Sequence, residues 1–163
     1  MSDHTTHKLA GIGSGTGFAA YRARGQCFEN FLAEVAGGAI GGYFGGILPD
    51  ILEPAISSWH RSTAHGYISG GTILASANAM LSTWEMACRN NAENCKALRM
   101  IPAPGGTFVV APPDPIQQLL SSLAELFWRL AAGFFNGFTA GYISHLALDA
   151  VTPRSIPLLT SGF

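Results

Sequence analysis

Imidazole and carboxylate side chains recur at short intervals in this sequence. His145 and Asp149 stand four residues apart, so in a helix both side chains lie on one face and can point at one ion. His60 and His65 are five residues apart, and Asp50 directly follows a proline. Neutral imidazoles and carboxylates are the ligands that zinc and related divalent ions take in proteins. These residue types therefore indicate divalent-metal chemistry.

Four apolar, glycine-rich stretches would have to position these side chains. We predict helices over residues 8 to 21, 31 to 48, 64 to 99 and 117 to 151, the last being one helix or two in line. The second stretch should stop at Pro49, because proline disfavours helical geometry in the residue before it. Prolines and glycines between residues 102 and 115 indicate a long loop, within which Thr107 to Val110 could form a short strand. The predicted fold is all-α.

Alternating helix directions would gather the candidate ligands at one pole of an up-and-down bundle. Short connections favour alternation, which places the start of the first and third helices beside the end of the second and fourth. That pole then holds His7, Asp50, His60, His65, His145 and Asp149. Each also has a structural interpretation: a hydrogen-bonded core histidine at 145, a cap at 149, a turn residue at 50, and solvated imidazoles at 7, 60 and 65.

Composition restricts the class of protein. The chain has 163 residues, which suit one domain (1–163), and is 48% hydrophobic and 12% charged with 20 glycines. This composition excludes a disordered chain, and the charge is low for a soluble surface. The net charge of -1 offers no basic field for nucleic acid. Three cysteines do not make a disulfide framework.

The spacing of the glycines favours helices that pack within a membrane. Glycine recurs every four residues at 37, 41 and 45, at 38, 42 and 46, and at 133, 137 and 141. Such small-xxx-small faces are typical of membrane helices, and uncharged runs of about 18 to 20 residues are long enough to span a bilayer. A soluble bundle with tight helix crossings is the alternative. An excess of Lys and Arg at the opposite pole would place the metal site outside the cytoplasm.

Three strings resemble a known family. "LPDILEP", "HRSTAH" and "GYISHLALDAVTPRSIPLL" are similar to the LPD-x-D-H-P, H-R-x-x-x-H and G-Y-x-S-H-x-x-x-D-x-x-T-P-x-x-x-P-L-L patterns of the YdjM-type family of membrane-bound metal-dependent hydrolases. The resemblance extends from His7 to Leu159. It implies an all-helical protein of the bacterial inner membrane, distantly similar to zinc-dependent phospholipase C and the zinc single-strand nucleases. Carried over by motif, the metal ligands are again His7, Asp50, His60, His65, His145 and Asp149.

The sequence departs from the family pattern after LPD, where Leu52 and Glu53 replace an aspartate and a histidine. Leu52 cannot bind a metal, whereas Glu53 could substitute a carboxylate for the imidazole, so the number of ions stays open. Asp50 or Glu53 would serve as general base, and Arg61 would neutralise charge on a phosphate or be a surface cation.

The resulting hypothesis is a membrane-associated hydrolase that cleaves a phosphoester, lipid-derived or small, through a metal-activated water. The expected cofactor is a divalent metal, zinc first, and the expected partner is membrane lipid; the oligomeric state is left open. Two alternatives stand beside it: a non-catalytic membrane protein with a structural metal site, and a soluble helical metal-binding bundle.

Overall fold

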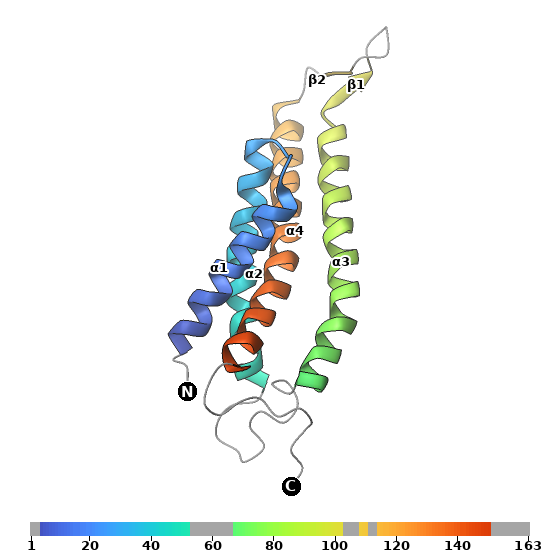
Figure 1. Cartoon of the computed structure of the whole chain (residues 1–163). Helices are drawn as coiled ribbons and strands as arrows, with labels where there is room; N and C mark the ends of the chain where they lie inside the picture. Colours follow the sequence, from blue (N-terminus) through green and yellow to red (C-terminus); the bar gives the residue numbers. More distant parts are fainter. Residues whose placement is uncertain (1–3, 53–66, 103–107, 111–113, 151–163) are drawn as a thin grey trace.

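Four long helices and one two-stranded sheet make up the described part of the chain (Figure 1). The computed structural model describes residues 4–52, 67–102, 108–110 and 114–150. The all-α prediction is confirmed, and the last apolar stretch is one continuous helix. The helices are α1 (His4–Ala23), α2 (Phe28–Leu52), α3 (Tyr67–Ala97) and α4 (Pro115–Ala150), and the antiparallel strands are β1 (Met100–Pro102) and β2 (Phe108–Val110).

The helices alternate in direction, as predicted from the connections. Figure 1 shows α1 beginning, α2 ending, α3 beginning and α4 ending at the same pole, with the small sheet at the other. We call the first of these the ligand pole. Between α1 and α2 the chain reverses at Gly25, whose φ of 86° is a conformation that glycine adopts without the steric cost of a Cβ. The predicted strand near residue 107 is confirmed as β2, and its partner β1 was not predicted.

Helix α2 continues through Pro49, so the prediction that it stops there is wrong. It ends at Leu52, and Pro49 is a fully buried residue within its final turn. A proline removes one backbone hydrogen bond and crowds the preceding turn. The ring lies in the last turn, so any kink displaces few residues, and its burial in the core offsets part of the penalty. The extra turn keeps Asp50 on the helix rather than in a loop.

Backbones of α1, α2 and α4 touch along matching glycine stripes. A Cβ added at Gly137 or Gly141 would come closer than 3.0 Å to the backbone of Gly38 or Gly42, respectively. Gly42 also borders α1, because a Cβ at this position would collide with the backbone carbonyl of Gly11. Helices with ordinary side chains pack with axes about 8 to 10 Å apart. Only glycine at these positions permits the closer approach that the structure has.

Small and charged residues are buried in the described part of the bundle, and many large apolar residues are exposed. The core contains small residues such as Ala19, Ala33 and Ala132 together with charged side chains such as Glu34 and Arg129. Large apolar side chains point outward instead. Those on α2 and α4 are Phe28, Leu32, Ile40, Phe44, Ile51, Leu52, Ile116, Leu119, Leu120, Leu123, Leu126, Phe127 and Ile143.

Of the described helices, α2 is long and apolar enough to cross a membrane by length and composition. Its glycine face is buried against α1 and α4, whereas Ile40 and Phe44 on the other face are exposed. Helix α3 packs chiefly on α4 and stands somewhat apart from the other two, with the rings of Trp84 and Phe135 at 5.4 Å between centroids.

Candidate metal centre

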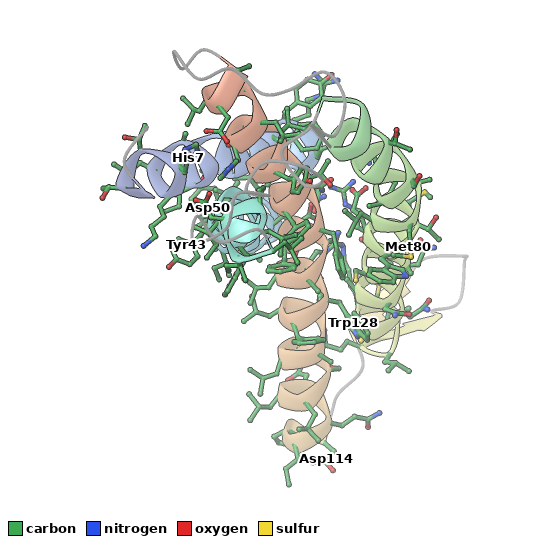
Figure 2. The ribbon with its side chains drawn as sticks, turned by 90° about the horizontal axis from the view of Figure 1, so that it is seen from below. His7, Tyr43, Asp50, Met80, Asp114 and Trp128 are labelled. Atoms are coloured by element: carbon green, nitrogen blue, oxygen red, sulfur yellow. The ribbon has the colours of Figure 1, made fainter. Side chains whose placement is uncertain are left out.

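Side chains from three helices meet at the ligand pole. They are His7 from α1, Asp50 from α2, and His145 and Asp149 from α4. Figure 2, which looks along the bundle from that end, shows His7 and Asp50 close together beside the last turns of α4. One ligand atom from each of His7, His145 and Asp149 lies within 4.8 Å of the others. A single ion can therefore reach all three.

His145 is the centre of this cluster and is held in one orientation. Its side chain is fully buried, and its Nδ1 lies 2.6 Å from the backbone carbonyl oxygen of Gly46 on α2. Because a carbonyl only accepts, Nδ1 must carry the proton and donate it. The other ring nitrogen, Nε2, then faces two carboxylates, at 3.6 Å from Asp50 Oδ1 and 3.4 Å from Asp149 Oδ2. A backbone acceptor behind a histidine is the arrangement that fixes a metal-binding tautomer.

His7 completes the cluster from α1. Its Nε2 lies 3.4 Å from Asp149 Oδ1, so the two oxygens of that carboxylate face different imidazoles. The His7 and His145 rings stack with centroids 4.0 Å apart and an interplanar angle of 26°. Two imidazolium rings stacked this closely would repel each other, which favours at least one neutral ring with a lone pair to offer.

The charge and burial of the cluster suit a divalent cation. When both imidazoles are neutral, as metal ligation requires, Asp50 and Asp149 carry two negative charges into a site where the side chains of His7, His145 and Asp149 are at most 5% exposed. Buried charges of one sign need a compensating charge. A divalent ion would supply it in full and would use nitrogen and oxygen ligands that zinc accepts. Asp50, whose side chain is 22% exposed, lies beside these three candidate ligands and is closer to solvent.

The glycine stripes explain why these side chains coincide. In each of the three helices the stripe of small residues, spaced by four, ends on a residue of the cluster: Gly11 leads to His7, Gly46 to Asp50, and Gly141 to His145. Residues spaced by four share a helix face. The faces that pack backbone against backbone are thus the faces that carry the candidate ligands, and the close packing of α1, α2 and α4 brings these side chains together.

The structure brings together four of the six predicted metal ligands. His7, Asp50, His145 and Asp149 converge, as expected from the alternating topology. The other predicted site residues, which are Glu53, His60, Arg61 and His65, lie outside the described residues. Their roles as ligands, base and phosphate-binding cation stay predictions.

A second buried polar cluster, at the pole opposite the ligands, was not predicted. Arg89 donates to Glu34 at 2.6 Å and also contacts Glu85 at 3.1 Å. Arg129 lies 3.4 Å from Glu34 and also bonds Glu93, and Arg22 donates to Glu85 at 2.6 Å. Three arginines and three glutamates from all four helices thus neutralise one another.

Two sequence signals could have revealed this charged cluster. Glu34 is the single charge in its apolar run, and Glu85, Arg89 and Glu93 recur every four residues on one face of a helix. The contacts of this cluster also give a structural role to part of the Lys and Arg excess at that pole, on which the predicted orientation in a membrane rests. Arg22, Arg89 and Arg99 are all engaged by carboxylates of the bundle, the last of them by Glu125.

Comparison with known proteins identifies no relative. No family model, no curated protein and no solved structure matches this chain. The resemblance to the YdjM-type family therefore rests on the three quoted motifs and stays a prediction. What the geometry contributes independently is a buried His7–His145–Asp149 group, with Asp50 beside it, that could bind a metal.

Proposed function

We propose that this protein is a membrane-associated, metal-dependent hydrolase that acts on a phosphoester. The observation that carries the proposal is the convergence of His7, His145 and Asp149 within 4.8 Å of one another, from two helices far apart in the sequence. Three protein ligands from imidazole and carboxylate groups are the set typical of catalytic zinc, which keeps a further position open. Zinc is therefore the proposed metal.

Each side chain of the site has a proposed role in hydrolysis. His145 is oriented by the Gly46 carbonyl, and Asp149 aligns both imidazoles. When bound, the ion lowers the pKa of a water to about 7 and polarises a phosphoryl oxygen. Asp50 is the nearest partly exposed carboxylate, 3.6 Å from His145 Nε2, and it is the proposed general base that accepts the proton of the attacking water. Glu53 and Arg61 keep their proposed roles as an alternative base and a phosphate-binding cation.

Membrane association is supported by the distribution of apolar residues. Exposed side chains on α4 such as Leu119, Leu123 and Phe127 would face lipid, while the glycines and the ion pairs are buried between helices. Exposure of so many large apolar side chains to water would be unfavourable, and large apolar patches are rare on soluble proteins. The candidate span α2 ends at the ligand pole. A site at this end of the bundle suits a lipid headgroup or another phosphoester at the membrane surface.

A structural metal site is the second candidate, and the burial of the ligands favours it. His145 is fully enclosed, and His7 and Asp149 are nearly so, which is typical of an ion that staples helices together. In this case the metal would raise the stability of the bundle without turnover. The two candidates share the ion and differ in whether substrate reaches it past Asp50.

Metal binding is tested first, on the purified full chain in detergent. We expect about one zinc per chain by elemental analysis, and loss of that zinc in His145→Ala and in Asp149→Asn. Asp114→Asn is the matched control, because Asp114 precedes α4 at the opposite pole and is exposed. Equal metal content in Asp149→Asn and Asp114→Asn would refute the site.

Hydrolysis is tested next, with the zinc-loaded chain and a panel of phosphomonoesters and phosphodiesters that includes short-chain phospholipids. Chelator-sensitive turnover, lost in Asp50→Asn while zinc stays bound, supports the hydrolase. Stoichiometric zinc with no cleavage of any member of the panel favours the structural candidate instead.

A further inference from the structure

A polar cavity lies between α1, α3 and α4, away from the metal centre. It has a volume of about 190 Å³ and is lined by Phe18, Arg22, Asn78, Leu81, Ser82, Phe135, Asn136 and Thr139. Asn136 precedes His145 by nine residues, which is about 13 Å along a helix. The cavity is therefore too far from the ligands to share one small molecule with them.

A buried donor in this cavity has no acceptor. Asn136 is only 6% exposed, and its Nδ2 has no hydrogen-bond partner among the described residues. Leaving such a donor unsatisfied costs about 1 to 3 kcal/mol, so native structures rarely do so without an occupant. An acceptor-bearing molecule in the cavity would remove that cost.

The hydrogen-bond donors that line the cavity favour an occupant with acceptor oxygens, even though the charge of Arg22 is balanced by Glu85. Arg22 is its single formally charged lining residue, and no aspartate or glutamate of the described segments lines it. One Nη of Arg22 donates to Glu85 Oε2 at 2.6 Å, and a guanidinium has further N–H groups to offer. Asn78 and Ser82 add an amide and a hydroxyl. The hydroxyl of Thr139 already donates to the Phe135 carbonyl, so its oxygen can only accept.

We propose that this cavity is a second binding site, and that it takes a small oxyanion such as a phosphate or a carboxylate. Arg22 and the Asn136 amide would donate to its oxygens, with Ser82 and Asn78 completing the site from α3. The volume far exceeds the 10 to 15 Å³ that one water requires, and it accommodates an ion of about five heavy atoms. The site is independent of the metal and of any hydrolysis.

Calorimetric titration of the full chain in detergent, stripped of metal with EDTA, tests the proposal. Inorganic phosphate and acetate are the two probes, for a tetrahedral and a planar oxyanion. We expect saturable binding of at least one of them, with a melting temperature that rises as the probe is added. The variant His145→Ala should bind as well as the parent chain, which separates this site from the metal centre.

Asn136→Leu removes the buried donor at nearly constant volume and should weaken binding about tenfold or more, the effect of one hydrogen bond to a charged group. Ser82→Ala is a milder second variant, should Asn136→Leu fail to fold, and it should also weaken binding. Asn90→Leu, on an exposed position of the same helix as Ser82, is the matched control and should bind normally. The proposal is overturned if the parent chain binds neither probe saturably, or if both cavity variants bind with unchanged affinity. In either case the cavity would hold only water.

Discussion

Replacing Gly15 or Gly17 by alanine should have opposite effects on this protein, although both glycines lie in α1. A Cβ at Gly17 meets nothing within 4 Å, whereas a Cβ at Gly15 meets the Gly38 carbonyl oxygen and lies 2.6 Å from the α-carbon of Gly42. All of the obstructing atoms are backbone atoms of α2. They cannot rotate away, so the two helices must separate.

The size of that separation follows from the interatomic distances. Ordinary van der Waals separation begins at 3.4 Å, so α1 and α2 must move apart by about 0.8 Å for the added methyl group to clear the α-carbon of Gly42. Overpacking of this kind costs about 1 to 3 kcal/mol. The better helix propensity of alanine returns up to about 1 kcal/mol. We therefore expect Gly15→Ala to be destabilised by up to about 2 kcal/mol, and Gly17→Ala to be stabilised by up to about 1 kcal/mol.

The same displacement should reach the metal centre. His7 lies two turns from Gly15 on α1, and it shares Asp149 with His145 of α4. Metal sites require ligand distances within about 0.2 Å, so a shift several times larger should lower zinc affinity by tenfold or more. Thermal unfolding in detergent and a chelator competition for zinc measure the two effects. If both alanine variants change stability and zinc affinity alike, the close helix crossing is not what positions His7.

Three further predictions concern the charges, the imidazoles and the membrane. Glu34→Gln should destabilise the bundle by about 3 to 5 kcal/mol, because it deprives the buried Arg129 and the half-buried Arg89 of their shared carboxylate. Glu93→Gln should cost less than about 1 kcal/mol, because Glu93 is 58% exposed. Equal unfolding free energies of the two variants in denaturant would contradict this prediction. Zinc affinity should fall as the pH is lowered from about 7.5 to 5.5, since protons compete for the imidazole nitrogens of His7 and His145. A zinc affinity that stays constant across this range would mean that neither imidazole is a ligand. The chain should stay in the membrane pellet through a high-salt wash and be released by detergent, and recovery in the supernatant without detergent would favour the soluble bundle.

Much of the fold was predictable because it depends on local pattern. Four apolar runs separated by prolines and charges predict four helices, and short connections predict their alternation. His145 and Asp149 were recognisable as a pair because a helix places residues i and i+4 on one face whatever surrounds it. Pro49 was misjudged for the opposite reason: its place inside α2 depends on burial in the core, which no local rule describes.

Which helix faces meet, and in what register, depends on the tertiary structure. The order of the amino acids specifies the glycine stripes and the candidate ligands, and it predicts the pole that these ligands share. Only the packed bundle decided that α2 and α4 lie with Gly46 against His145, 99 residues away, and that the charges of Glu34 and Arg129 are buried together. The physical reason is that helix periodicity arises from hydrogen bonds four residues apart, whereas the register between helices is selected by close packing of side chains and backbones that are remote along the chain.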